Sequence, residues 1–498
     1  MKVSSFLLRA LNVRRSEWGL VQKLFLLQFF QGAGIAFFFT AAFSRFLDHF
    51  PVKDLAYVYV LSSFLLWGAG FIYGKLEHHL SSSRLCNLVT LVLLLSMVLF
   101  RVGAATTNGN WFYFLMLAWF NVLYLLNNLM FWGMAAQLYD VRQSKRLFGV
   151  ISAGDIPAKF IGYSVALFIV SYTGTANLLL AGFICILCSF PFLKKILQAQ
   201  KAGKNHHSDS SKHVSGLNSI VKNYTDNKLI KRVAILSLIV SASVILINYG
   251  FYAEVKQAYK NDVEFARFIA FFLAAARLIA LIIKILFTSR LLYWLGNRFA
   301  LLVTPIIFIS LIAVLLLTDM MNYNGKIVLY IFGLSAIMVD VLRSAINSPV
   351  LLTMMQPLAT LQRLRAHNIV KGIMDPFAYF FCGAFLLIVF NRNIYSLEIL
   401  VYVLLALALA WVIGIFRVHQ QYLKTLIKTI SSRYFSQEEF SLYDHAAREL
   451  IENKINAGTE LEVLYILKML ATRRGEESSE LIIQALKHPS VRVINEAL

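Results

Sequence analysis

The chain has 498 residues, of which 59% are hydrophobic and only 15% are charged, and its mean hydropathy is +0.67. This composition excludes an ordinary water-soluble globule and indicates a protein that crosses a membrane many times. The net charge of +21 does not indicate a nucleic-acid-binding protein. The lysines and arginines lie in short segments between apolar runs, where the positive-inside rule places them.

A membrane-spanning helix needs about 20 mainly apolar residues, and this length serves to divide the sequence. The twelve runs that qualify cover residues 20–47, 55–74, 85–105, 111–138, 148–172, 176–193, 233–253, 265–287, 299–318, 327–354, 368–390 and 397–416. We therefore expect an all-α polytopic membrane protein with twelve spans in two sets of six.

The basic residues predict the orientation of these spans. Segments assigned to one side of the membrane hold twenty-two lysines and arginines, and segments on the other side hold six. Both termini are therefore predicted to face the cytoplasm of a multi-pass cell-membrane protein, and we expect the bacterial inner membrane. The first 19 residues combine basic residues with a broken apolar run and lack a small-residue cleavage site, so we expect no removable signal peptide.

The polar stretch 194–232 is predicted to be a cytoplasmic linker between two bundles, residues 1–193 and residues 233–418. Its histidines, His206, His207 and His213, could form a metal tract. A solvated linker explains them better, because no cysteine or carboxylate stands at a suitable spacing.

The cysteines give no reason to expect a metal site or a disulfide framework. All four lie within or at the edge of apolar runs, where cysteine is usually a packing residue. They are Cys86, Cys185, Cys188 and Cys382. We expect no cofactor and no bound metal.

The remainder of the chain, 419–498, is predicted to be a cytoplasmic helical tail with its charge on one face. Its last segment resembles a HEAT repeat, with one helix before the turn Pro489-Ser490 and a second after it. Such a pair cannot bury its apolar face alone. We therefore expect the final helix to dock either on the membrane domain or on a cytoplasmic protein that contacts residues 437–498, the alternative being an ordinary amphipathic tail.

Two distant stretches, 128–162 and 347–383, share a framework of polar residues, a phenylalanine and a glycine at nearly equal spacing. This indicates an internal duplication, although hydrophobic helices can also resemble one another through composition alone. The matched residues are Asn128, Gln137, Asp155, Phe160 and Gly162 in the first stretch, and Asn347, Gln356, Asp375, Phe380 and Gly383 in the second.

Longer motifs carry a resemblance to known families. The turn GKLEHHLSSSR, Gly74 to Arg84, resembles the signature loop of the major facilitator superfamily in degenerate form. Three further stretches, 131–149, 343–358 and 368–383, resemble the ATP:ADP antiporter family, especially its bacterial branch fused to HEAT repeats.

The resemblance implies a major-facilitator-type bundle of two six-span halves that moves a nucleotide by alternating access. One motif departs from the family pattern. Where the family has Asp-Pro-Thr-Lys-Glu, this chain has Ser348-Pro349-Val350-Leu351-Leu352, without charges.

Charged residues inside spans are costly, at about 2.5–3.5 kcal/mol each on insertion scales, and therefore mark candidate sites. Arg277 has no acidic neighbour on its own helix and is the first candidate for binding an anion, its alternative being an ion pair with Asp340. Lys284 lies two turns further on the same face, and Asp340 and Arg343 are adjacent on one helical face.

Two further pairs, Asp155 with Lys159 and Lys371 with Asp375, stand at helical spacing. Either they lock neighbouring helices together, or they form a gate between the halves. The uncharged candidates for lining the substrate site are Asn128, Tyr124, Gln31 and Asn248, each of which could equally bond between helices.

Three functions fit the sequence. The first is a secondary transporter for an organic anion, with a nucleotide or nucleotide-like metabolite as cargo, lying in a lipid bilayer. The second is a transporter or flippase of a lipid or other amphipathic molecule, and the third is a scaffold that recruits a partner through its tail. An enzyme is not expected, because the sequence contains no Walker loop, HExxH motif or Ser/His/Asp order in a suitable context.

Overall fold

The structure is a computed structural model of the whole chain. The residues that it describes are 14–106, 109–138, 147, 151, 154–204, 227–259, 262–286, 288–320, 325–347, 350–351, 354–355, 358, 370–391, 397–431, 451–452, 455–456, 460–471, 476–486 and 489–497.

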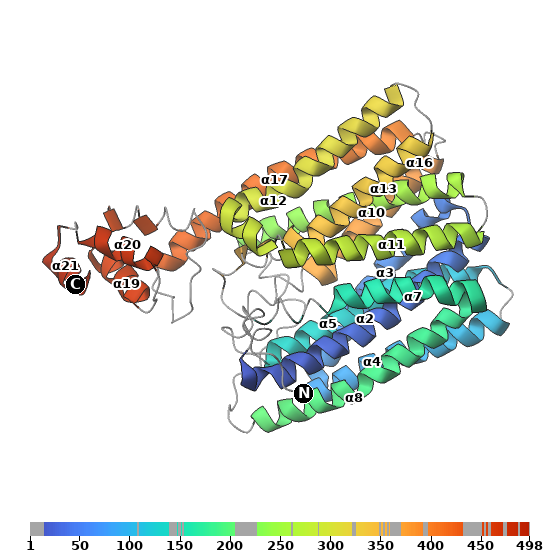
Figure 1. The fold of residues 1–498 in the computed structure, drawn as a ribbon, viewed down its shortest axis with the longest axis horizontal. Coiled ribbons are helices and arrows are strands. Elements are labelled where there is room, and N and C mark those ends of the chain that lie inside the picture. Colours follow the sequence, from blue (N-terminus) through green and yellow to red (C-terminus); the bar gives the residue numbers. More distant parts are fainter. Residues whose placement is uncertain are drawn as a thin grey trace.

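The first half is a bundle of long helices, which fills the lower part of Figure 1. Two short 3₁₀ turns, η1 (Val52–Asp54) and η2 (Thr175–Asn177), join neighbouring helices at one end of the bundle. The long helices are α2 (Arg15–His49), α3 (Leu55–His79), α4 (Ser82–Thr106), α5 (Trp111–Leu138), α7 (Asp155–Thr173) and α8 (Leu178–Lys204).

The second half repeats this arrangement with six helices. Two π-helical turns, η3 (Arg343–Asn347) and η4 (Val370–Met374), follow α13 and precede α16. The long helices are α10 (Lys228–Ala258), α11 (Asp262–Leu286), α12 (Thr288–Met320), α13 (Gly325–Leu342), α16 (Asp375–Asn391) and α17 (Leu397–Ser431).

Each of the twelve predicted runs overlaps one of these helices, which confirms the all-α membrane fold. Within the described ranges, nine helices are by themselves long and apolar enough to cross a membrane, and two shorter apolar stretches lie in α11 and α13.

The last span continues well beyond residue 418, where we predicted the second bundle to end. Helix α17 runs to Ser431 because Val418, Tyr422 and Leu426, spaced by four residues, are buried along one face. Helices α8 and α10 likewise extend into the predicted linker 194–232, α8 as far as Lys204 and α10 from Lys228.

Helix packing relates the two halves by a pseudo-twofold exchange. In the first half α2 packs on α5, α7 and α8, and in the second half α10 packs on the equivalent helices α13, α16 and α17. Between the halves, α7 packs on α11 and α3 packs on α16. These helices are the second (α3), fifth (α7), eighth (α11) and eleventh (α16) spans. Exchanging α7 with α16 and α3 with α11 therefore converts one interface into the other. This is the arrangement expected of parallel repeats around a central site.

The interface between α3 and α16 depends on a close approach of the two backbones. A Cβ atom at Gly383 would lie 2.8 Å from the carbonyl oxygen of Ala56 and 2.8 Å from Val60 Cγ2. Only glycine leaves room for this contact, as is usual where membrane helices pack closely.

The halves also meet at the end of the bundle that lies away from the tail (Figure 1). Lys256 Nζ of α10 donates a hydrogen bond to the carbonyl oxygen of Leu47 in α2 at 3.1 Å. The rings of Phe43 and Tyr252 pack with their centroids 4.5 Å apart. These contacts join α2 to α10, and we call them the distal contacts.

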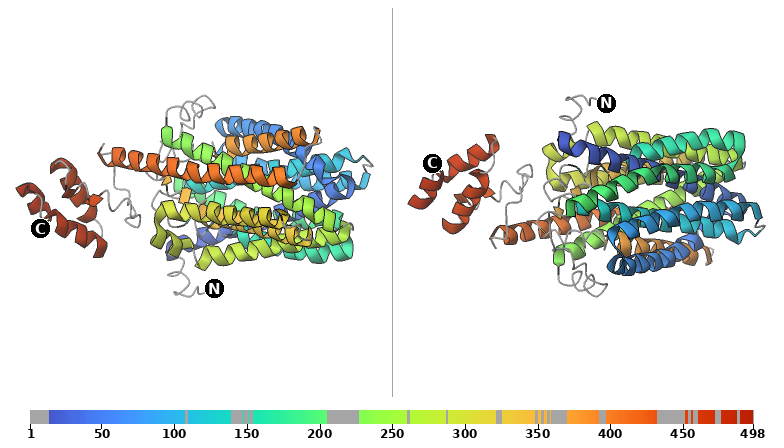
Figure 2. Two further views of the ribbon diagram at one scale, coloured as in Figure 1. Left: turned by 90° about the horizontal axis from the view of Figure 1, so that it is seen from above. Right: turned by 90° about the horizontal axis from the view of Figure 1, so that it is seen from below.

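The described part of the tail includes the short helices α19 (Glu460–Ala471), α20 (Glu476–Ala485) and α21 (Val491–Ala497), which lie beyond the end of α17 (Figure 2). They bury a small apolar core of their own that includes Val463, Leu467 and Leu481. The tail therefore packs as a separate unit, and its similarity to a HEAT repeat remains a prediction.

Candidate functional site

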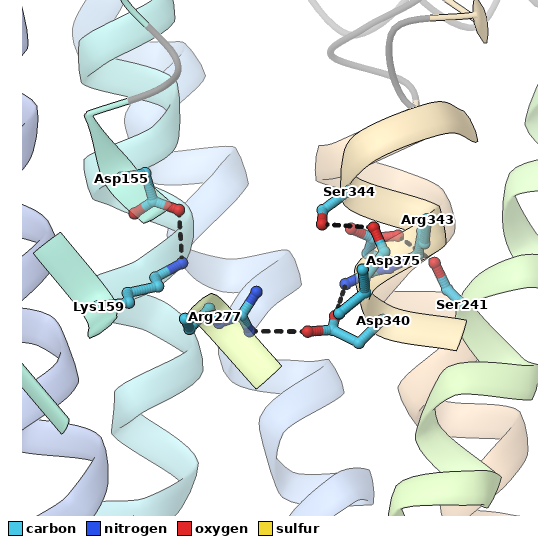
Figure 3. Close-up of polar contacts among 9 residues, drawn as sticks. Asp155, Lys159, Ser241, Arg277, Asp340, Arg343, Ser344 and Asp375 are labelled. Carbon is cyan, nitrogen blue, oxygen red and sulfur yellow. Dashed lines mark hydrogen bonds and ion pairs between the residues drawn. The ribbon is translucent and has the colours of Figure 1, made fainter. Parts of the chain in front are cut away.

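Three charged side chains meet between α11 and α13 in the second half (Figure 3). Arg277 Nη2 lies 2.9 Å from Asp340 Oδ2, and Arg343 Nη2 lies 3.2 Å from Asp340 Oδ1. Asp340 and Arg343 share a face because they are three residues apart on α13 and its π-helical extension, and α11 brings Arg277 to them. We call these residues the arginine–aspartate triad. It combines two guanidinium groups with one carboxylate.

The triad retains unused hydrogen-bonding capacity. Nε of Arg277 is buried and has no hydrogen-bond partner among the described residues. The Nε atoms of Arg45, Arg101 and Arg298 are buried without a described partner in the same way, so this property alone does not mark a ligand site. A guanidinium group binds a carboxylate or phosphate through two parallel hydrogen bonds. The positive charge of Arg277 suits such an anionic ligand.

A second ion pair lies within α7 of the first half. Lys159 Nζ is 2.8 Å from Asp155 Oδ2, as the spacing of four residues predicted. The same ammonium lies over the ring of Tyr124 in α5, 4.8 Å from its centroid. Lys159 is only 7% exposed, and this pair is therefore held by packing as well as by charge.

A chain of polar contacts lies beside these charges, and one of its bonds joins the two halves. Asp375 Oδ1 accepts a hydrogen bond from Ser241 Oγ of α10 at 2.7 Å. Tyr379, one turn after Asp375 on α16, donates to Asn121 Oδ1 of α5 at 3.1 Å, and Asn121 Nδ2 donates to Ser62 Oγ of α3 at 3.0 Å. The bond from Tyr379 to Asn121 crosses from the second half to the first.

All these charges lie near the middle of the bundle. A Cβ atom at Gly32, close to the midpoint of α2, would lie 3.1 Å from Asp155 Oδ1. Ser241, the partner of Asp375, is likewise close to the midpoint of α10. The two aspartates of the internal duplication therefore lie at similar depths in the bundle.

The other sequence candidates are placed as follows. Gln31 is fully buried on α2, and neither its Oε1 nor its Nε2 has a hydrogen-bond partner within the described part of the chain. Asn128 Nδ2 donates to the carbonyl oxygen of Tyr124 at 3.0 Å, and Asn248 is half-buried on α10. The side chains of Lys284 and Lys371 lie outside the described residues, as do those of Gln137 and Gln356 and the histidines of the linker.

Ser62 and Tyr379 are among the groups at the site that are not candidates from the sequence. The position of Tyr379 offered a signal, because it stands four residues after Asp375 and shares its helical face. No comparable pattern marks Ser62. Among the described residues, no cluster of three histidine, cysteine, aspartate or glutamate side chains could hold a metal ion.

Comparison with solved structures shows the fold. The nucleoside transporter NupG is 14% identical, with a TM-score of 0.55 over 81% of this chain and 99% of that chain. A bacterial homologue of the iron transporter ferroportin, in an outward-facing state, is 14% identical, with a TM-score of 0.59 over 80% of this chain and 99% of that chain.

Comparison of the sequence with family models is more specific. No curated protein matches the chain, whereas the model described as TLC ATP/ADP transporter matches residues 23–351, well over half of its length. This range includes the fourth, fifth, eighth and tenth spans, and so it contains the whole arginine–aspartate triad and the Asp155–Lys159 pair. The chain belongs to the TLC ATP/ADP transporter family.

Proposed function

We propose that this secondary transporter carries a nucleotide or a nucleotide-like anion, which binds at the arginine–aspartate triad. The observation that carries the proposal is the meeting of Arg277, Asp340 and Arg343 inside the helix bundle. Charges inside such a bundle are retained where they bind substrate or move it, and family membership indicates a nucleotide as the cargo.

The composition of the triad favours an anion. Two guanidinium groups share one carboxylate, so the triad carries a net positive charge, and Nε of Arg277 is available for a further bond. A phosphate group offers several oxygens at the spacing that a guanidinium fork requires. Phosphate is therefore a better match than a neutral or cationic substrate.

Transport follows from relative movement of the two halves around this site. The distal contacts close the bundle at the end away from the tail, while α7–α11 and α3–α16 form the interfaces along which the halves can rock. Because the sequence has no nucleotide-hydrolysing motif, the movement is driven by exchange or by an ion gradient.

Uptake of radiolabelled ADP into proteoliposomes tests the proposal. Arg277→Ala should reduce uptake at least tenfold, and Arg277→Lys should restore only part of it, because lysine keeps the charge and loses the fork. Arg101→Ala is the matched control, since Arg101 hydrogen-bonds Asn177 in a different part of the bundle. Uptake by Arg277→Ala equal to that of the control would remove the triad from the substrate site.

A thermal-shift screen of the purified protein separates the proposed cargo from its rivals. Nucleotides should raise the melting temperature of the wild type and not of Arg277→Ala. Stabilisation by lipids alone would favour a lipid carrier. If no small molecule stabilises the protein and a soluble protein co-purifies through residues 437–498, the scaffold function gains support.

The orientation and the role of the tail belong to the same proposal. The excess of basic residues supports cytoplasmic termini in a bacterial inner membrane. The separate apolar core of α19–α21 supports a HEAT-like unit that contacts a cytoplasmic protein. Deleting residues 437–498 should therefore leave uptake intact and abolish capture of that protein.

A further inference from the structure

The internal duplication allows the two sides of the site to be compared residue by residue. Its framework aligns Asn128 of α5 with Asn347 at the end of the tenth span, and helix packing makes α5 and α13 equivalent. The same offset aligns Asn121 with Asp340 and Tyr124 with Arg343. Thus the positions that carry charges in the second half carry an amide and an aromatic ring in the first.

Tyr124 lies close to the triad although it belongs to the other half. The ammonium group of Lys159 rests over its ring. Ile156, three residues before Lys159, packs in one apolar cluster with Ala280 of α11 and Val341 of α13, which are close to the triad in sequence. Its side chain is 38% exposed, in contrast to the buried lysine beside it. The ring of Phe120, one turn earlier on α5, lies at 27° to it, with the centroids 6.3 Å apart. Tyr124 is thus a partly exposed aromatic ring beside Lys159 and near the triad.

Asn121 fixes the surroundings of this ring. Both ends of its amide are engaged, the oxygen accepting from Tyr379 and the nitrogen donating to Ser62. Since Asn121 is three residues before Tyr124 on the same helical face, these bonds hold α3 and α16 beside the ring. The aromatic surface is therefore positioned by both halves of the protein.

We propose that the site has two parts, in which Arg277 and Arg343 bind the phosphate of the substrate and Tyr124 stacks on its base. This inference rests on the proposed function and narrows it. The substrate must be an anion that carries a flat aromatic ring, as a nucleotide does. Pyrophosphate and ribose 5-phosphate occupy the charged part alone and bind more weakly than ADP.

The test uses full-length protein in detergent and compares the binding of ADP, ribose 5-phosphate and pyrophosphate by titration calorimetry. Stacking between a base and an aromatic side chain corresponds to a change in affinity of about tenfold. Tyr124→Leu should weaken ADP binding by about this factor and leave pyrophosphate binding unchanged, whereas Tyr124→Phe should retain ADP binding. Tyr330→Leu is the matched control, because Tyr330 is 66% exposed on α13.

The outcomes distinguish this inference from the function on which it rests. Unchanged ADP binding by Tyr124→Leu, or an equal loss for ADP and pyrophosphate, would overturn the stacking role while leaving the charged part intact. If the wild type binds neither ADP nor pyrophosphate, the proposed function itself fails. Melting temperatures of Tyr124→Leu and Tyr330→Leu within a degree of the wild type would exclude misfolding as the cause of a loss.

Discussion

Replacing Asp340 by asparagine removes the carboxylate that two arginines share. At the observed separations of 2.9 and 3.2 Å, each pair contributes about 5 kcal/mol of Coulomb attraction at an effective dielectric constant near 20. Desolvation offsets most of this gain, and breaking a buried pair typically costs about 3–5 kcal/mol, because the remaining charge loses its partner. Asp340→Asn should therefore lower the free energy of unfolding of the substrate-free protein by about 3 kcal/mol.

A bound anion should restore much of this stability, because it replaces the missing carboxylate. Thermal unfolding in detergent measures both effects: the variant should melt below the wild type without ligand and gain more than the wild type on addition of pyrophosphate. In liposomes the variant should lose net uptake into empty vesicles and retain exchange with internal substrate. During net uptake the empty transporter has to change conformation while its two arginines lack a counter-charge. During exchange the bound anion supplies that charge.

Asp54→Asn is the control for this experiment, because Asp54 lies in η1 at the distal end of the bundle. It should change neither ligand stabilisation nor the balance between net uptake and exchange. Equal melting temperatures for Asp340→Asn and the wild type, with equal shifts on adding pyrophosphate, would refute the view that Asp340 compensates the two arginines.

Three further predictions concern packing, gating and the Asp375 contact. Gly383→Ala should lower stability by about 1–3 kcal/mol through overpacking, measured by thermal unfolding. Gly68→Ala on α3 should be tolerated, because a Cβ atom added there would meet no neighbouring atom within 4 Å. Phe43→Cys combined with Tyr252→Cys, in a cysteine-free background, should allow a short bifunctional thiol reagent to block uptake; full activity after cross-linking would exclude opening at the distal contacts. Ser241→Ala should lower the free energy of unfolding by about 1.5–3 kcal/mol, because it removes a hydrogen bond to a carboxylate, and an unchanged melting temperature would contradict this.

Much of the architecture could be predicted because a bilayer imposes its length on the sequence. Each of the twelve apolar runs overlaps a helix in the described part of the chain. The repeated framework of Asn128 and Asn347 anticipated the relation between the halves. The C-terminal end of α17 was less predictable. Hydropathy falls after residue 416, yet the buried face of Val418, Tyr422 and Leu426 continues the helix.

The residues of the candidate site could be predicted from the sequence, whereas the contacts between different helices could not. The cost of burying charge singled out Arg277, Asp340 and Arg343, and the pair on α13 followed from helical spacing. The contact from Arg277 to Asp340 depends on how α11 packs against α13, which was one of two alternatives at the sequence level. The bond from Tyr379 to Asn121 joins positions far apart in the chain, and no periodicity in the sequence encodes such a pairing.

The π-helical turns give the second half an adjustable register. Segment η3 begins at Arg343, directly after α13, and η4 ends immediately before Asp375. A π turn holds one residue more than an α turn, so rewinding it would rotate the residues beyond it by about 100° around the helix axis. The guanidinium of Arg343 and the carboxylate of Asp375 each lie next to one of these π-helical turns. A shift of one residue within the turn would therefore rotate the neighbouring group away from the centre of the protein without breaking the helix.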